Sequence, residues 1–293
     1  MQKKFLLAGI AVLITAICLF VWGFLIEPNR LSVKTYEIRL KKWSDKLNGF
    51  KIAAVSDLHA GSNFITEEKL RQIVAETNAQ NPDIIVLLGD YVSPVFNNQQ
   101  KLKMPMQTIA ENLRDFQAKY GVYAILGNTD ETYDKTEVRS ELEKIGFKVL
   151  KDEIASVEIN GERLRLLGMR DAMETGDWNS ISAGLKKVLA EDEQKGNLIV
   201  LVHNPDYLPV ITGDLLISND LSLILAGHTH GGQCRFPLIG APVVPSEYGQ
   251  KYAAGHIREQ ETDMFVTTGI GTSKIPARFG VPPEISILKI YAE

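Results

Sequence analysis

Residues 51–59 read Lys-Ile-Ala-Ala-Val-Ser-Asp-Leu-His, a short apolar run that ends in an Asp-x-His pair. The apolar run 51–56 predicts a buried β-strand. Asp57 and His59 follow it directly, so both side chains can point toward the same loop crest. Because sites in α/β sheets gather where strands end, this stretch predicts a strand with a chemical site at its carboxyl end.

Four more polar clusters follow apolar runs in the same way. The strands expected before them cover 83–88, 120–126, 198–202 and 221–226. The clusters are Gly89-Asp90, Gly127-Asn128-Thr129-Asp130, His203-Asn204 and Gly227-His228-Thr229-His230-Gly231-Gly232. Five strand ends of one α/β protein that each carry polar side chains predict a single site assembled from all of them.

The residue types in these clusters are those of a metal site. Asp, Asn and His are ligands that divalent ions such as Mn, Fe or Zn accept. The His-x-His pair at His228 and His230 brings two imidazoles close together. A single Asp that bridges two ions would form a two-metal site about 3.5–4 Å across, which suits hydrolysis of a phosphate ester.

Each cluster taken alone has a plainer interpretation. A lone Asp-x-His is more often a surface turn, Gly-Asp and Gly-Asn are common turn dipeptides, and His203 alone would more often be a packed or capping residue. Four of the five histidines nevertheless fall in these clusters, and the order and spacing of all five clusters argue against coincidence. The fifth histidine, His256, is expected on the surface of a loop.

The rest of the chain alternates strand and helix patterns, which predicts α/β layers. Helical spacing covers 67–80, 105–119, 136–145 and 181–189, and Thr66 is the expected N-cap of the first helix. Asn160-Gly161 predicts a hairpin turn. Further strands are expected at 36–40, 147–150, 154–159, 163–168, 264–268 and 285–291. The late hairpins predict a second, more antiparallel sheet, and 235–255 is expected to be a long functional loop.

The N-terminus predicts a membrane segment. Residues 5–26 form a run without a charged side chain, and roughly 20 apolar residues span the hydrocarbon core of a bilayer. A cleaved signal peptide is the alternative, but its apolar region is typically about 7–15 residues and ends in small side chains. We therefore expect an uncleaved anchor at 1–30 and a single domain at 31–293, with the linker-like stretch 27–31 directly after the apolar run.

The side of the membrane on which the domain lies stays open. Lys3 and Lys4 before the run favour a cytoplasmic N-terminus and an exported domain. Basic residues also follow the run, at Arg30, Lys34, Arg39, Lys41, Lys42 and Lys46, and they favour a cytoplasmic domain. In either orientation this basic stretch would attract anionic lipid headgroups. The expected location is a single-pass protein of the bacterial inner membrane, with membrane lipid as a partner.

Composition limits the other classes of function. Hydrophobic residues make up 45% and charged residues 23% of the 293 residues, which is a globular balance. The net charge of −4 gives no sign of a nucleic-acid partner. The two cysteines, Cys18 and Cys234, are poor disulfide partners because Cys18 lies inside the apolar run, so cysteine usage does not reveal the redox compartment.

Together the five clusters resemble the pattern of the calcineurin-like metallophosphoesterase superfamily, which runs Asp-x-His, Gly-Asp, Gly-Asn-His-Asp/Glu, His and Gly-His-x-His. The match extends over about 51–293. The resemblance implies a four-layer α/β/β/α sandwich, two divalent metal ions at one rim (manganese first, iron or zinc as alternatives) and a metal-dependent phosphoric ester hydrolase. It assigns the first ion to Asp57, His59 and His230, the second to Asn128, His203 and His228, and the bridging position to Asp90.

One position departs from the family pattern. Thr129 stands where the family usually has the histidine that is thought to protonate the leaving group or steady the transition state, while Asp130, its usual orienting partner, remains. A threonine hydroxyl donates hydrogen bonds but is no acid near neutral pH. We expect the metal site to survive this change and activity on poor leaving groups to suffer, since general-acid help is typically worth about 10²–10⁴-fold.

Within the superfamily the chain resembles the membrane-anchored bacterial phosphodiesterases (YkuE/YaeI-like). The features that carry this are the N-terminal apolar run, the sequence Gly-His-Thr-His-Gly-Gly-Gln at 227–233, and Gly-Thr-Ser at 271–273 followed by Arg-Phe-Gly-Val-Pro-Pro-Glu at 278–284. The branch is also similar to enzymes that cleave UDP-2,3-diacylglucosamine in lipid A synthesis.

Substrate expectations follow from the anchor and two further features. The apolar loop 236–245 would seat an acyl chain or, alternatively, pack on the domain itself. Arg278 is a candidate phosphate contact because a guanidinium grips phosphate with two hydrogen bonds; a structural ion pair is the alternative. We expect hydrolysis of a phosphodiester or pyrophosphate in a phosphorylated small molecule or lipid. A metal-binding scaffold with little catalysis and a protein phosphatase are the alternatives.

Overall fold

The computed structural model describes residues 2–171, 178–192, 195–212 and 220–293. Its helices are α1 (Gln2–Val21), α2 (Glu67–Asn78), α3 (Met106–Leu113), α4 (Asn128–Lys144), α5 (Trp178–Glu191) and α6 (Leu208–Thr212). Its strands are β1 (Ser32–Leu40), β2 (Phe50–Val55), β3 (Ile84–Leu87), β4 (Pro94–Val95), β5 (Asn98–Leu102), β6 (Val122–Ala124), β7 (Lys148–Val149), β8 (Glu153–Ile159), β9 (Glu162–Gly168), β10 (Asn197–Leu201), β11 (Leu221–Ala226), β12 (Gly255–Glu259), β13 (Thr262–Val266) and β14 (Glu284–Ala292). This element order confirms the predicted α/β class.

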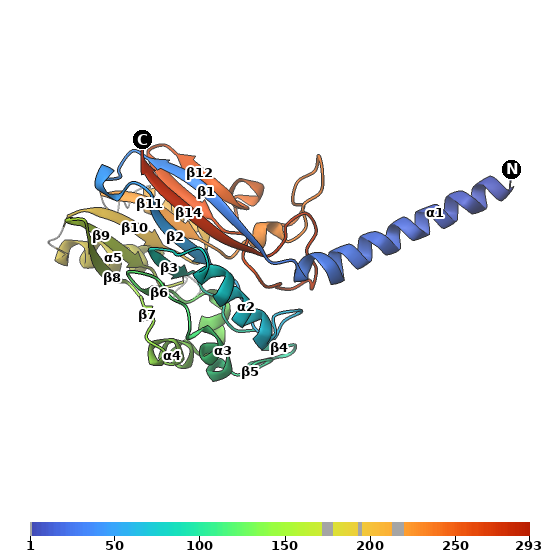
Figure 1. Ribbon diagram of the computed structural model, residues 1–293, viewed down its shortest axis with the longest axis horizontal. Helices are drawn as coiled ribbons and strands as arrows, with labels where there is room; N and C mark the ends of the chain where they lie inside the picture. The colour runs from blue at the N-terminus through green and yellow to red at the C-terminus, as the bar shows by residue number, and fades with distance from the viewer. Residues whose placement is uncertain (1, 172–177, 193–194, 213–219) are drawn as a thin grey trace.

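Two six-stranded sheets form the centre of the described part of the chain (Figure 1). The first sheet has the order β1-β14-β2-β3-β6-β7, and the second has the order β12-β13-β11-β10-β9-β8. A buried apolar cluster between them draws side chains from both sheets, including Ile52, Leu223 and Phe265. The predicted face-to-face arrangement of two sheets is therefore confirmed.

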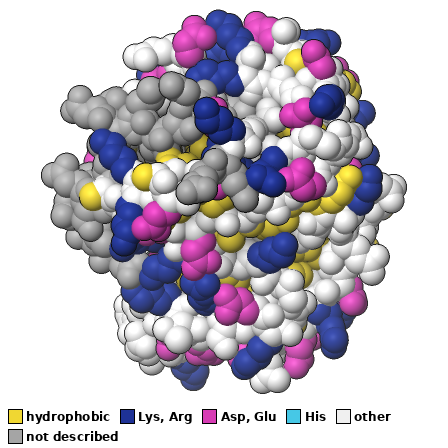
Figure 2. Space-filling model, turned by 90° about the vertical axis from the view of Figure 1, so that its left-hand side faces the viewer, with side chains coloured by type: hydrophobic (Ala, Val, Ile, Leu, Met, Phe, Trp, Pro, Cys, Tyr) yellow, Lys and Arg dark blue, Asp and Glu magenta, His cyan; other side chains and the backbone are white. Residues whose placement is uncertain are grey.

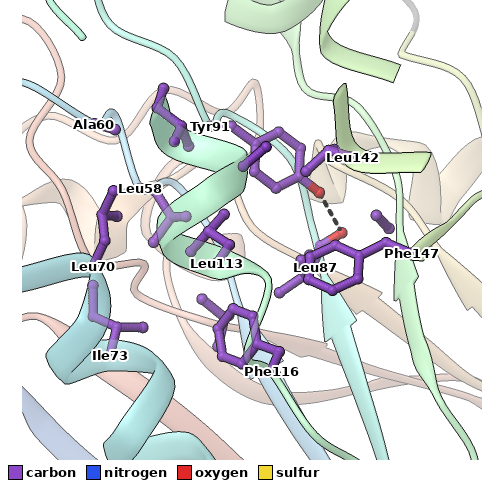
Figure 3. Close-up of a cluster of buried hydrophobic side chains, with 14 of the residues drawn as sticks. Leu58, Ala60, Leu70, Ile73, Leu87, Tyr91, Leu113, Phe116, Leu142 and Phe147 are labelled. Carbon is purple, nitrogen blue, oxygen red and sulfur yellow. Dashed lines mark hydrogen bonds between the residues drawn. The ribbon is translucent and has the colours of Figure 1, made fainter. Parts of the chain in front are cut away.

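Helices cover the outer faces of both sheets. On the first sheet, α2, α3 and α4 close an apolar cluster to which Leu70, Leu113 and Leu142 belong (Figure 3). The same close-up shows the Tyr91 hydroxyl donating to the carbonyl oxygen of Leu87 at 3.2 Å. On the second sheet, Leu185 of α5 and residues of α6 pack on a third cluster. The four layers match the expected α/β/β/α order.

The second sheet corrects one expectation. We predicted a more antiparallel sheet, but β9, β10, β11 and β13 run parallel, and only the edge pairs β8–β9 and β12–β13 are antiparallel. The hairpin at Asn160-Gly161 is confirmed, with φ angles of 52° and 75°. The hairpin joins β8 and β9 at the edge of the sheet. Its presence in the sequence therefore gave no information about the direction of the strands in the centre of that sheet.

Two predicted helices differ in extent. The helix expected at 105–119 ends at Leu113. The helix expected at 136–145 belongs to α4, which already begins at Asn128 and is interrupted at Asp134. The Asp134 carboxylate accepts hydrogen bonds from the backbone N–H groups of Thr136 and Glu137, so it caps the helical turn that the sequence pattern detected. The turns of α4 before Asp134 begin with the Gly127–Asp130 cluster.

The N-terminal helix projects away from the sandwich, and its side chains are exposed (Figure 1). It is the one helix of the described residues that is long and apolar enough to cross a membrane. The stretch 27–31 is no loose linker, which corrects our expectation. Glu27 and Pro28 are buried in a short 3₁₀ turn, and the Trp22 indole N–H donates to the Glu27 carboxylate at 2.6 Å.

The core between the sheets should dominate stability. Replacing the fully buried Leu223 with Ala should lower the free energy of unfolding by about 2–5 kcal/mol, because it leaves a cavity between the sheets. The measurement is a denaturant titration of the full chain in detergent micelles. The exposed Phe96 is the control: Phe96→Ala should change stability by less than about 0.5 kcal/mol. Equal losses in the two variants would contradict a core at this position.

Candidate metal centre

The five polar clusters meet at one rim of the sandwich. Strands β2, β3 and β6 run side by side and parallel in the first sheet, and β10 and β11 do so in the second. Their carboxyl ends therefore lie at the same edge. The side chains brought together there are Asp57 and His59 after β2, Asp90 after β3, Asn128 after β6, His203 after β10, and His228 and His230 after β11.

One group of ligand atoms surrounds Asp57. Nε2 of His230 lies 3.5 Å from the Asp57 Oδ1 atom and 3.3 Å from Nε2 of His59. Ligand atoms of Asp57, His59 and His230 all lie within 4.8 Å of one another. His59 Nε2 also lies 3.4 Å from Oδ2 of Asp90. These residues could hold one divalent ion.

A second group lies on the other side of Asp90. Nε2 of His203 is 3.6 Å from Asp90 Oδ1, 3.1 Å from Asn128 Oδ1 and 3.3 Å from Nδ1 of His228. The Asp90 carboxylate thus faces His59 with one oxygen and His203 with the other. This is the arrangement expected of a carboxylate that bridges two ions.

The donor set fits divalent ions. Oδ1 of Asp57 is buried and has no hydrogen-bond partner among the described residues, an arrangement that is costly unless a cation binds there. Nδ1 of His203 lies 2.7 Å from the Leu88 carbonyl oxygen. Because a carbonyl oxygen only accepts, that contact requires the proton on Nδ1, and it leaves Nε2, which faces the centre, as the atom that would bind a metal ion.

The charges of the centre also favour the binding of cations. Burial raises the pKa of Asp90, but the His203 and His59 imidazoles and the Thr129 hydroxyl outweigh it and hold the pKa below its usual value. Burial likewise raises the pKa of Asp57, and the imidazoles of His230 and His203 reverse the shift. Burial lowers the pKa of His230 to about 3, so this ring is neutral. Two ionised carboxylates beside a neutral imidazole suit cationic ligands.

The backbone of the centre is strained. Five of the expected ligands have positive φ angles: Asp57 (56°), His59 (44°), Asp90 (56°), His228 (70°) and His230 (51°). A non-glycine residue in this region costs of the order of 1–3 kcal/mol. Such strain gathers at functional sites, where the surrounding structure holds it in place.

Two glycines make room for Asp57. A Cβ atom on Gly227 would lie 2.0 Å from Oγ of Ser56 and 2.8 Å from Oδ2 of Asp57. Gly269 has a φ angle of +64°, and its Cβ would lie 2.8 Å from the Cβ and Oδ2 atoms of Asp57. Sequence reasoning missed Gly269. The only available signal was its place just after the strand expected at 264–268.

Asp130 organises the loops around the centre and does not orient the Thr129 side chain. Its carboxylate accepts hydrogen bonds from the backbone N–H groups of Asp90, Tyr91 and Gly127 at 2.8–2.9 Å, and from that of Val92 at 3.3 Å. Burial and then the Asp90 charge raise the pKa of Asp130 to about 7 against these donors. The side chain therefore ties the loop after β3 to the loop after β6.

Thr129 holds the central carboxylate. Its backbone N–H donates to Oδ1 of Asp90 at 2.8 Å, and its hydroxyl donates to Oδ2 of Asp90 at 2.8 Å. Both Asp90 oxygens are thus oriented by one residue. Because its hydroxyl donates to Asp90, Thr129 positions that carboxylate. The family pattern, which has a histidine at this place, did not reveal this role.

Arg278 corrects a further expectation. We proposed it as a phosphate contact, but it is fully buried and its guanidinium donates to the carbonyl oxygens of Thr268, Gly271 and Val281. Nη2 also lies 3.3 Å from Nδ1 of His230. The structure therefore places Arg278 behind His230, where its charge disfavours protonation of that ring, rather than in contact with substrate.

His256 lies outside the centre, as expected, but in a strand rather than a loop. It belongs to β12, and its Nε2 atom lies 2.6 Å from Oδ1 of Asp263. Arg258 donates to the same carboxylate oxygen. This cluster pairs charges at the edge of the second sheet.

Comparison with known proteins agrees with this geometry. The model of the calcineurin-like phosphoesterase family matches residues 50–232, which contain all seven expected ligands. The chain belongs to the calcineurin-like phosphoesterase family. The resemblance seen in the sequence is thereby confirmed, and with it the assignment to a class of phosphoesterases.

Several relatives of this phosphoesterase are similar over most of its length. An uncharacterized metallophosphoesterase, YkuE of Bacillus subtilis, is 28% identical over 90% of this chain and 87% of its own. Phosphodiesterase YaeI of Escherichia coli is 30% identical over 86% of each chain. A transmembrane protein with a metallophosphoesterase domain from Danio rerio is 30% identical over 94% of this chain, which spans 61% of that protein.

The phosphoesterase should depend on the Thr129 hydroxyl for metal binding. Thr129→Val keeps the side-chain shape but removes the donor to Asp90 Oδ2, so the affinity for Mn²⁺ should fall by about 10–100-fold. Isothermal titration of the metal-free protein with Mn²⁺ measures this. Thr129→Ser retains the hydroxyl and should bind as the wild type does. Equal affinities of the Val and Ser variants would show that the hydroxyl does not support Asp90.

Proposed function

We propose that the chain is a dinuclear-metal-dependent phosphodiesterase or pyrophosphatase that acts at a membrane surface. The observation that carries this proposal is the position of Asp90, whose two carboxylate oxygens face histidines of two separate groups of ligands. We propose manganese as the metal, with iron or zinc as alternatives. The ligand assignment is Asp57, His59 and His230 for one ion, Asn128, His203 and His228 for the other, and Asp90 for both.

The residues of the chain define what this centre can do. Two bound divalent ions would neutralise phosphoryl charge and lower the pKa of a water molecule. Asp90 fixes the spacing of the two groups of ligands, and Thr129 and Asp130 keep Asp90 and its loop in place. Because residue 129 is a threonine, whose hydroxyl is no acid near neutral pH, this position has no group that can protonate a leaving oxygen.

That missing acid favours leaving groups of low basicity. A phosphate released from a pyrophosphate has a second pKa near 6 and departs as an anion without help. An alkoxide released from an ordinary phosphodiester does not. Thr129 therefore supports a phosphoric anhydride, or a diester with an activated leaving group, over a simple dialkyl diester.

The N-terminal helix supports a location at a membrane. We propose that residues 1–30 form a single-pass anchor and that residues 31–293 form the catalytic domain. The length and apolar character of the helix support this, as does the similarity to a relative described as a transmembrane protein. The bacterial inner membrane is the membrane we propose, because the chain is similar to two bacterial phosphoesterases over most of its length.

A groove beside the centre supports a lipid-linked substrate. It has a volume of about 260 Å³, and His230 is one of the residues that line it. Its walls include the apolar residues Pro242, Val243, Pro245 and Ile275 and the basic residue Lys274. An apolar groove whose lining includes a proposed metal ligand suits a phosphate attached to an acyl chain, such as UDP-2,3-diacylglucosamine.

The two alternatives predict different outcomes. A metal-binding scaffold would bind two ions and hydrolyse no activated ester, and Thr129 is the feature that favours it. A protein phosphatase would hydrolyse phosphopeptides. The apolar groove next to His230 is a poor match for a phosphoprotein surface, so we rank this alternative last.

Loss of Asp90 should abolish hydrolysis. Asp90→Ala removes the residue shared by both groups of ligands and with it several kcal/mol of charge stabilisation. Since about 1.4 kcal/mol is a factor of ten, kcat/KM for bis-p-nitrophenyl phosphate should fall by about 10³-fold or more. The assay uses the full chain in detergent with and without Mn²⁺.

Asp263→Asn is the matched control, because Asp263 is a buried carboxylate bonded to His256 outside the centre. It should retain metal-dependent turnover. Undiminished turnover in Asp90→Ala would refute the two-metal mechanism. Metal binding without turnover in the wild type would favour the scaffold.

The KM of substrates that enter the groove should depend on the length of their alkyl group. For p-nitrophenyl alkyl phosphodiesters, KM should fall about fourfold for each methylene that becomes buried, from about 0.8 kcal/mol per methylene. Val243→Asp should remove this dependence and leave turnover of bis-p-nitrophenyl phosphate unchanged. Phe96→Asp, at an exposed apolar position outside the groove, should leave both unchanged. A wild-type KM that does not vary with alkyl length would contradict the lipid-linked substrate.

A further inference from the structure

We infer that the loops around the foot of α1 form a second membrane contact, in which apolar side chains enter the lipid bilayer beside the anchor. The side chains concerned are Phe236, Leu238, Ile239, Val243 and Ile275, which we call the apolar rim. The inference depends on the proposed membrane anchoring of α1. It adds a lipid-binding surface to the folded domain itself.

Exposure sets the apolar rim apart from the remaining surface. Among described residues after Ile26, the large apolar side chains that are exposed are Phe96, Phe236, Leu238, Ile239, Val243, Tyr248 and Ile275. All except Phe96 fall between 236 and 275. Leu238 is fully exposed and Val243 is 72% exposed. Exposed apolar side chains gathered in one place mark a surface that meets another apolar phase.

The apolar rim is attached to the foot of the anchor. The backbone N–H of Arg278 donates to the Gly23 carbonyl oxygen at 2.9 Å. The neighbouring Phe279 stacks on Phe236 with a ring separation of 5.3 Å, and its carbonyl oxygen accepts from the backbone N–H of Arg235 at 2.7 Å. The segment at 278–279 therefore connects the end of the apolar helix to the loop that carries the rim.

The joint between anchor and domain is ordered. Glu27 is buried and accepts from the Trp22 indole, and the Arg30 guanidinium lies 5.3 Å from the centre of the Trp22 ring. The Lys69 ammonium donates to the Asn29 carbonyl oxygen at 3.2 Å. The helix thus meets the domain at a defined place, and Trp22 and Arg30 are typical of the membrane–water interface.

These contacts select the bilayer as the occupant of the surface. In Figure 1, α1 leaves the domain on the side where the loops of 236–245 and 270–283 lie. Exposed basic residues border the rim at Arg235 and Lys274 and suit anionic headgroups. Figure 2 views the face opposite α1, where Lys and Arg lie among Asp and Glu around a band of hydrophobic side chains.

The test measures depth in the bilayer on the full chain. A fluorescent amino acid replaces Leu238, and the protein is reconstituted into phospholipid vesicles that carry nitroxide groups at different depths of the acyl chain. Asn160, in the hairpin turn after β8, is the control site within the domain. Phe20, within α1, is the control for the anchor.

The fluorophore at position 238 should be quenched from a depth of about 5–10 Å below the headgroups, as for an interfacial apolar segment, and the fluorophore at 160 should not be quenched. Quenching at 20 without quenching at 238 would overturn the inference and leave the anchoring intact. Absence of quenching at both 20 and 238 would overturn the anchoring and the inference together. A blue shift at 238 without nitroxide quenching would assign the surface to a protein contact, such as a second copy of this chain, and would also overturn it.

Discussion

The carboxylate of Asp90 is the group on which the arrangement of this site depends. It is 3% exposed and carries a depressed pKa, so the fold holds a buried negative charge at the meeting point of two sheets. Such a charge persists only with hydrogen bonds and opposite charge close by. The two Thr129 donors supply the first, and the surrounding histidines, or the ions they would bind, supply the second. His59 lies against one of its oxygens and His203 against the other.

The two-sheet sandwich makes this meeting point possible, and it does so at a local cost. Parallel strands bring five carboxyl ends to one rim, but the loops that follow must turn sharply, and five ligands adopt left-handed backbone angles. The buried core between the sheets and the Asp130 network provide the rigidity that keeps such angles in place. The loops after the strands, rather than the strands themselves, therefore connect the stability of the fold with the chemistry of the metal centre.

Much of this site could be predicted from the sequence, because each ligand follows directly on its strand. Asp57, His59, Asp90 and His230 were identified by position, and the structure brings them together. What the sequence could not show depends on long-range packing. Gly269 matters only because the end of β13 lies against Asp57. Arg278 was taken for a phosphate contact because a guanidinium can grip phosphate, and the sequence did not show that the surrounding loop turns the carbonyl oxygens of Thr268, Gly271 and Val281 toward it. The direction of β9 and β13 within their sheet likewise depends on neighbours that are remote in the chain.

The central claim is that seven side chains hold two ions on either side of Asp90. Anomalous X-ray diffraction from crystals of the protein grown with Mn²⁺ tests it most directly, because the technique locates each ion independently of activity. The account predicts two anomalous peaks about 3.5–4 Å apart, with one oxygen of Asp90 toward each. A single peak, or two peaks that Asp90 does not touch, would contradict it.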